Sequence, residues 1–138
     1  MQKGIIQFHI PHLKRNDVIE MSSFSLNWKI EKTFPIIFLD GDITSEADSL
    51  LEEAYFEIRN NAKKKIYIFD FEKANYINSS GISSFIKIIH MHKEENGDFI
   101  FTGLSEHLKK VMDIVGLTDY VKIYDTIETA IQKSKDSI

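Results

Sequence analysis

Two neighbouring hydroxyls stand near the middle of the chain, in the stretch "NYINSSGI" that spans residues 75–82. An apolar run that begins at Ile66 precedes this stretch and an apolar helical pattern follows it, so Ser79 and Ser80 are expected at the N-terminus of a helix. A serine or asparagine at that position accepts hydrogen bonds from free backbone N–H groups, and Gly81 lets the first turn pack closely. Capping needs only one such residue, so it does not account for both hydroxyls.

Two acidic residues form a second candidate, in the stretch "FLDGDIT" that spans residues 38–44. Its D-x-D-x-T form resembles the nucleophile motif of haloacid-dehalogenase-type phosphatases. The resemblance implies that Asp40 attacks phosphorus beside a Mg²⁺ ion and that Asp42 acts as general acid. The alternative, which we favour because so short a motif matches by chance, is a glycine-centred turn with acids near a helix N-terminus.

The remaining composition argues against a metal or cofactor. The chain has five histidines and no cysteine, which excludes a disulfide, a thiolate metal site and a cysteine nucleophile. His90 and His92 lie two residues apart on a predicted helix and therefore do not share a face. We expect no metal site and no cofactor.

Charge and hydropathy restrict the partners and the location. The net charge of −4 gives no basic footprint for nucleic acid, so we expect none to bind. No run approaches the roughly 18 to 20 apolar residues of a membrane span, and the first residues are too weakly apolar for a signal peptide. The sequence therefore predicts a soluble, cytoplasmic protein.

Strands and helices alternate after residue 22. We expect strands near residues 24–30, 35–40, 66–71, 98–103 and 121–125, and helices near 44–61, 80–96, 105–115 and 126–135. The first helix shows the clearest buried stripe, which consists of Ala47, Leu50, Leu51, Ala54, Tyr55 and Ile58. This order predicts an α/β sandwich with a mixed sheet of about four to five strands and about four helices.

The first 22 residues fall outside this alternation. We expect them to form an N-terminal extension, with residues 4–10 as an extra edge strand, ahead of one domain that spans residues 23–138. An edge strand can pair with another chain, so this extension is also the expected route to a homo-oligomer.

Three segments together resemble a known family, the STAS domain of the anti-sigma-factor antagonist type. "LDGDIT" is similar to the family's hydrophobic-x-G-[DE]-[LI]-[DT] turn, and "FDFEKANYINSSGI" to a strand followed by D-S-S-G-[LI]. "GDFIFTGLSEHLKKVMDIVGLTDYVKIYDTIETAI" looks like the family's closing strand, helix, "GL" turn, strand and helix. The resemblance covers about residues 24–133 and implies a STAS-like sandwich.

The resemblance also implies a function, that of a bacterial regulatory binding module which takes part in signal transduction and the regulation of transcription and is not an enzyme. In such antagonists the first serine of D-S-S-G is the phosphoacceptor, which corresponds to Ser79, with Ser80 as second choice. The implied partners are an anti-sigma factor that is itself a Ser/Thr kinase, and a phosphatase that removes the phosphate. Phosphorylation adds roughly −1.5 to −2 charges to an interface that had held a neutral hydroxyl. The sequence departs from the motif at Asn78, which cannot supply the family's carboxylate.

The expected switch loop is Asn78, Ser79, Ser80 and Gly81. The expected partner surface adds Ser83, Ser84 and Lys87, which a helical projection places opposite Phe85, Ile86 and Ile89, and it adds Asp42 and Thr44 from the preceding turn. Two alternatives stay open, a STAS scaffold without phosphorylation in a stressosome-like or lipid-transport assembly, and the phosphatase that uses Asp40 and Asp42.

Overall fold

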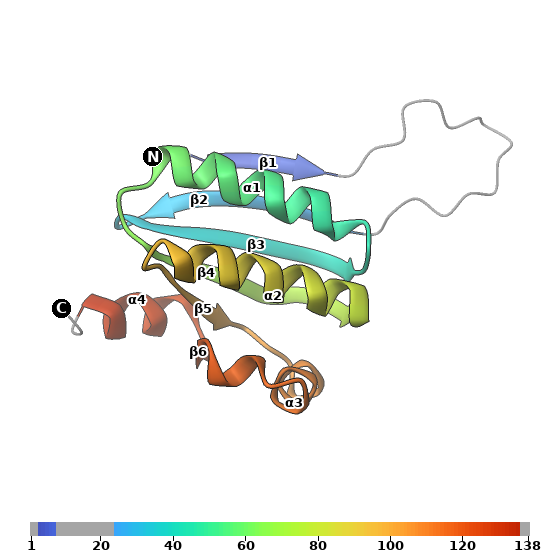
Figure 1. Ribbon diagram of the computed structural model, residues 1–138. Coiled ribbons are helices and arrows are strands. Elements are labelled where there is room, and N and C mark those ends of the chain that lie inside the picture. Colours follow the sequence, from blue (N-terminus) through green and yellow to red (C-terminus); the bar gives the residue numbers. More distant parts are fainter. Residues whose placement is uncertain (1–2, 8–23, 136–138) are drawn as a thin grey trace, which may run out of the picture.

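The computed structural model describes residues 3–7 and 24–135, and its strands form one sheet in chain order (Figure 1). The strands are β1 (Lys3–Gln7), β2 (Ser25–Glu31), β3 (Phe34–Ile43), β4 (Ile66–Ile77), β5 (Asp98–Thr102) and β6 (Lys122–Tyr124). β1, β2 and β3 pair antiparallel, and β3 to β6 pair parallel. The sheet is therefore mixed, as predicted.

Four α-helices connect or follow the strands. They are α1 (Ala47–Asn61), α2 (Ser79–Glu94), α3 (Glu106–Ile114) and α4 (Ile127–Lys135), and a short 3₁₀ helix, η1 (Leu117–Asp119), precedes β6. Each parallel connection is a crossover, and crossovers that advance in one direction place their helices on one face. Accordingly α1 and α2 lie side by side over the same face of the sheet (Figure 1).

The alternation of side chains along β4 and β5 divides the core into two clusters. Phe69 and Phe99 point to the face under α1, α2 and α3, whereas Ile68 and Ile100 point to the opposite face, where α4 packs. The cluster under α1 and α2 is much the larger, and the ring of Phe85 from α2 lies 5.0 Å from that of Phe69. Aromatic packing thus fixes α2 on the middle of the sheet.

The six apolar residues predicted to form the buried stripe of the first helix are all buried in α1. Two strands are longer than predicted, because β3 continues to Ile43 and β4 to Ile77. The expected turn around Gly41 is therefore wrong: this stretch is part of β3. Its pairing with β4 shifts register there, and Gly41 has φ 97°, a conformation that glycine adopts without strain.

The N-terminal region is described only in part. β1 is an edge strand that pairs with β2 from Lys3↔Lys29 to Gln7↔Ser25. Residues 8–10 of the expected edge strand, and the connector up to residue 23, lie outside the described residues. The division of the chain at residue 22 and pairing with another chain stay predictions.

Candidate functional site

The switch loop lies where two parallel strands end. The last pairs of β3 and β4 are Asp42↔Tyr76 and Ile43↔Ile77, and the backbone N–H of Asn78 then donates to the carbonyl of Ile43 at 3.1 Å. Because α1 follows β3 and α2 follows β4, both helices begin at this edge of the sheet (Figure 1). The carboxyl edge of parallel strands is where α/β proteins place their functional groups.

Asn78 caps α2. Its backbone is extended, and its side-chain Oδ1 accepts a hydrogen bond from the backbone N–H of Gly81 at 3.0 Å. This is the ordinary geometry of an N-cap residue, and the side-chain amide supplies the oxygen as well as a carboxylate would. The helix therefore starts at Ser79 without using either serine as its cap.

Ser79 and Ser80 are both exposed in the first turn of α2. Within the described residues, no hydrogen bond involves the side-chain hydroxyl of either serine. The free backbone N–H groups and the positive end of the helix dipole favour negative charge at this position. A negative charge on either hydroxyl would therefore cost no side-chain hydrogen bond among the described residues.

Gly81 is required by space. It is buried, and a Cβ atom added to it would lie 2.4 Å from the carbonyl oxygen of Ile43 and 2.9 Å from the Ile77 side chain. A side chain at this position would therefore push the start of α2 away from the ends of β3 and β4.

Ser84 differs from its expected position, because it is only 3% exposed. Its hydroxyl donates to Asp48 Oδ1 at 2.8 Å, and it also lies 3.1 Å from the carbonyl of Ser80. The prediction that Ser84 faces solvent is therefore wrong, whereas Ser83 is exposed as predicted. The reason is that α1 covers this side of α2, so Ser84 ties the first turn of α2 to α1.

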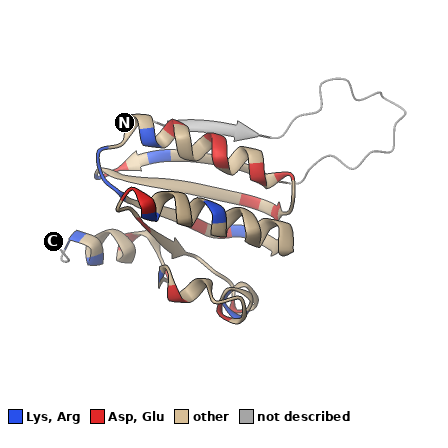
Figure 2. Ribbon diagram, viewed as in Figure 1, with Lys and Arg blue, Asp and Glu red and all other residues tan. Residues whose placement is uncertain are grey.

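Lys87 extends the same connection between the helices. Its ammonium lies 2.9 Å from Asp48 and 3.0 Å from Glu52, and Figure 2 shows the acidic residues along α1 beside the basic segment of α2. The hydrogen bonds from Lys87, and then from Ser84, lower the pKa of Asp48. Those to Asp48 and Glu52 raise the pKa of Lys87. At neutral pH this part of the expected partner surface is a network of ion pairs.

The remaining predicted residues lie on the neighbouring strand end. Asp42 and Thr44 are half-buried, and the Thr44 hydroxyl donates to Glu46. Asp40 is exposed opposite Lys73 in the β3–β4 pairing. No group of three or more His, Asp or Glu in residues 3–7 and 24–135 is placed to hold a metal ion.

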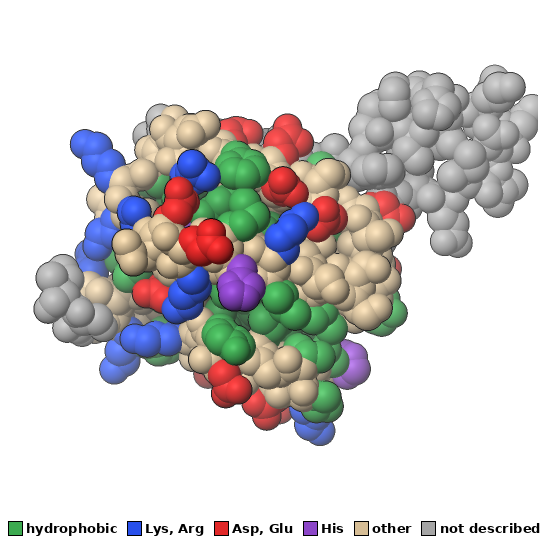
Figure 3. Space-filling model, in the orientation of Figure 1, with side chains coloured by type: hydrophobic (Ala, Val, Ile, Leu, Met, Phe, Trp, Pro, Cys, Tyr) green, Lys and Arg blue, Asp and Glu red, His purple; other side chains and the backbone are tan. Residues whose placement is uncertain are grey.

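The exposed face of α2 also carries apolar area that the prediction missed. Ile86, expected in the buried stripe, is 43% exposed, and with Val115 and Tyr120 it lines a hollow of about 410 Å³ between α2 and the end of α3. Figure 3 shows hydrophobic side chains gathered below the charged surface of the two helices. Ser79, Ser83 and Ile86 follow one another at helical spacing, so the face that begins at Ser79 leads to this hollow.

Comparison with known proteins identifies the family. A sequence model of the STAS domain family matches residues 25–130. The chain belongs to the STAS domain family. A curated relative, the anti-sigma-B factor antagonist of Staphylococcus aureus, is 23% identical over 107 residues, which cover 75% of this chain and 98% of the relative.

Solved structures share the fold. An anti-sigma factor antagonist from Mycobacterium paratuberculosis superposes with a TM-score of 0.69 at 15% identity, covering 80% of this chain and 93% of the other. The phosphorylated form of the Bacillus cell-fate determinant SpoIIAA gives 0.61 at 21% identity, covering 80% and 98%. None of the helices in the described part of this STAS domain is long and apolar enough to cross a membrane.

Proposed function

We propose that this STAS protein is a regulatory binding module of the anti-sigma-factor-antagonist type, switched by phosphorylation of Ser79. The partner would be an anti-sigma factor with Ser/Thr kinase activity, and a phosphatase would reverse the modification. The family and the names of its curated relatives support the class of function. SpoIIAA, a structural neighbour, has been solved in both phosphorylated and unphosphorylated forms.

The observation that carries the proposal is that Asn78, and not Ser79, caps α2. Asn78 provides the cap of α2, and the exposed Ser79 has no side-chain hydrogen bond among the described residues. A phosphate on Ser79 would interact favourably with the helix N-terminus and would break no hydrogen bond among the described residues. Docking on this face would require that charge to be desolvated, so affinity would fall while the fold persists.

The partner surface would combine the polar start of α2 with its neighbours. Ser83 and Lys87 are exposed on α2, and Thr44 lies beside the loop on the β3 side. Ser84 is buried against Asp48, so its role would be to hold the surface together.

Phosphopeptide mapping of the protein purified from its own cells, grown with and without stress, tests the proposal. The expected result is a singly phosphorylated form whose phosphate maps to Ser79, and which the Ser79→Ala variant lacks and Ser83→Ala keeps. The absence of phosphate from Ser79 and Ser80 under every condition would contradict regulation by phosphorylation. The protein would then be a constitutive STAS scaffold, in keeping with the missing carboxylate at Asn78.

A variant sharpens this test. Asn78→Asp restores the family's carboxylate and keeps an oxygen that can cap α2. If the carboxylate promotes phosphorylation, the phosphorylated fraction should rise in Asn78→Asp above that of the natural chain. An equal fraction in both would show that the amide serves the kinase equally well.

A further inference from the structure

The C-terminal end of α2 holds a buried imidazole with an unusual set of contacts. His92 is 1% exposed, and its Nε2 lies 2.7 Å from the carbonyl oxygen of Lys65. Its Nδ1 lies 3.1 Å from the hydroxyl oxygen of Tyr55. The same hydroxyl oxygen lies 3.1 Å from Glu95 Oε2, within hydrogen-bond distance. These contacts join α1, α2 and the residue before β4.

Counting hydrogens shows that a neutral imidazole cannot satisfy all three contacts. A carbonyl only accepts, so Nε2 must carry a hydrogen, and in the neutral ring Nδ1 then has a lone pair. The Tyr55 hydroxyl has a single hydrogen, which it can donate to Nδ1 or to Glu95 but not to both. In the imidazolium, Nδ1–H donates to the Tyr55 oxygen, and the Tyr55 hydrogen is free for Glu95.

We propose that His92 is a proton-operated switch, whose protonation redirects the Tyr55 hydroxyl from Nδ1 to the carboxylate of Glu95. The proton comes from solvent and stays on Nδ1. The hydroxyl hydrogen rotates about the Tyr55 C–O bond, and no covalent bond is made or broken between heavy atoms. This switch is independent of Ser79 and of the proposed function.

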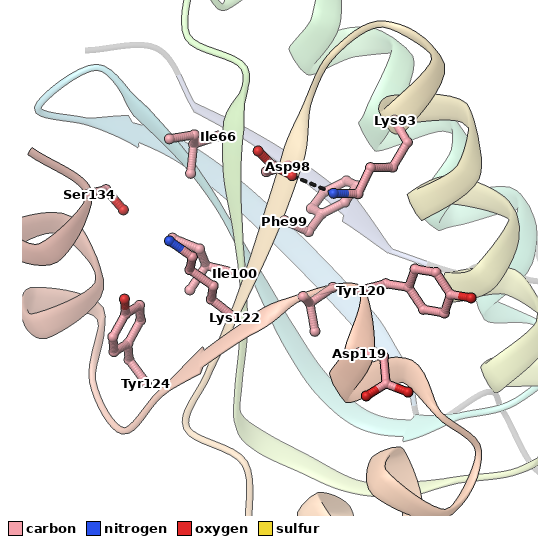
Figure 4. A pocket seen from close by; sticks show the side chains of 11 residues that line it. Ile66, Lys93, Asp98, Phe99, Ile100, Asp119, Tyr120, Lys122, Tyr124 and Ser134 are labelled. Carbon is pink, nitrogen blue, oxygen red and sulfur yellow. Dashed lines mark hydrogen bonds and ion pairs between the residues drawn. The ribbon is translucent and has the colours of Figure 1, made fainter. Parts of the chain in front are cut away.

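The surroundings both oppose and support the charged form. Burial of the imidazole lowers the pKa of His92, while the Lys65 carbonyl, Glu95 and Asp98 act in the opposite direction. Arg59 lies 3.4 Å from Glu95, and Lys93 pairs with Asp98 at 2.6 Å (Figure 4). The Tyr55 hydroxyl lies within hydrogen-bond distance of Glu95, so Glu95 is the carboxylate that Tyr55 can connect to His92.

Packing holds the ring in this position and leaves a path for the proton. The Tyr67 ring stacks on His92 at 4.1 Å, and a Cβ added to Gly97 would lie 2.2 Å from the imidazole. His92 also borders a surface hollow of about 220 Å³. The ionisable groups around that hollow are Arg59, Lys63, Lys64, Lys65, Tyr67 and Glu95.

The test is an NMR titration of His92 in the full chain, with ¹⁵N shifts that report which ring nitrogen carries hydrogen. Glu95→Gln removes the negative charge of the carboxylate that can accept from Tyr55. Glu94→Gln, at the neighbouring exposed position, is the matched control. We expect the neutral form to carry hydrogen on Nε2 and His92 to titrate while the protein is folded. Glu95→Gln should lower its pKa by about half a unit or more, and Glu94→Gln by much less.

The Tyr55→Phe variant distinguishes an effect of Glu95 that passes through the Tyr55 hydroxyl from direct charge attraction between Glu95 and His92. In Tyr55→Phe the link from His92 to Glu95 is absent, so Glu95→Gln should then change the pKa of His92 far less than it does in the natural chain. An equal effect of Glu95→Gln in both backgrounds would overturn the proposal. So would a His92 that does not titrate before unfolding, or a neutral form that carries hydrogen on Nδ1.

Discussion

The hydroxyls at the N-terminal end of α2 are exposed, whereas the imidazole at its C-terminal end is buried. Ser79 makes no side-chain hydrogen bond within the described residues, while His92 contacts Lys65 and Tyr55. The two residues are about 20 Å apart along one helix. The comparison shows how α2 can offer a modifiable group at one end while polar contacts at the other end anchor it to the fold.

The anchoring also differs in kind. At the N-terminal end, close backbone approach at Gly81 and the Ser84–Asp48 hydrogen bond hold the helix beneath an exposed surface. At the C-terminal end a titratable ring fills the space that Gly97 leaves. The first end should therefore tolerate charge on its surface, and the second should respond to protons.

The largest effect is expected from Gly81→Ala. Alanine normally favours a helix over glycine, but here the new methyl group would overlap the Ile43 carbonyl. We expect the free energy of unfolding to fall by about 3 kcal/mol, as measured by urea denaturation. Ser80→Ala, at the exposed neighbouring position, is the control and should change it by less than about 0.5 kcal/mol. A stabilised Gly81→Ala would show that the helix start is loosely packed.

The two ends of α2 should lose their contributions to stability at different pH values as the solution is acidified. Because burial lowers the pKa of His92, the unfolded chain binds more protons than the folded one just below about pH 6.5. Stability at this end is therefore present at neutral pH and is lost as the pH falls toward the lowered pKa. The pKa of Asp48 is lowered from 3.8, so its contribution is lost only below about pH 4.

Urea denaturation of the natural chain, His92→Gln and Asp48→Asn between about pH 8 and 3 separates these two contributions. His92→Gln should reduce the dependence of the unfolding free energy on pH between about pH 7 and 5. Asp48→Asn should reduce it only in the most acidic part of the range. If the unfolding free energy of His92→Gln changed with pH near pH 6 as steeply as that of the natural chain, another group would be responsible for the loss of stability in acid.

The smallest effect is expected from the pair of serines within α2. Ser84→Ala removes the hydrogen bond to Asp48 and should cost about 1 kcal/mol in unfolding free energy. Ser83→Ala should cost less than about 0.5 kcal/mol, because Ser83 is exposed. Equal losses for the two variants would contradict the burial of Ser84 against α1.

The start of α2 was predictable because it depends on neighbours in sequence. Asn78, Ser79 and Gly81 have the residue types that begin a helix, and the structure places the cap at Asn78. The buried positions of α1 were predictable for the same reason, since one strong period of 3.6 residues covers the whole helix.

The network around His92 was missed, although a signal was present. Phe85, Ile88 and His92 continue one buried stripe along α2, and treating the histidines only as metal ligands hid that continuity. The partners of the ring, Tyr55 and Lys65, are far away in sequence, so no local pattern could identify them.

The sequence by itself determined the alternating elements, the STAS family and a polar helix start with two serines, because these follow from periodicity and local motifs. Only the tertiary structure decided that Ser84 is buried while Ile86 is exposed, and that the Tyr55 hydroxyl lies between His92 and Glu95. The physical reason is that these environments depend on how other elements lie beside α2: α1 covers Ser84 and brings Tyr55 to His92, while the end of α3 borders Ile86. The placement of α1 beside α2 arises only when two crossovers pack on the same face of a parallel sheet.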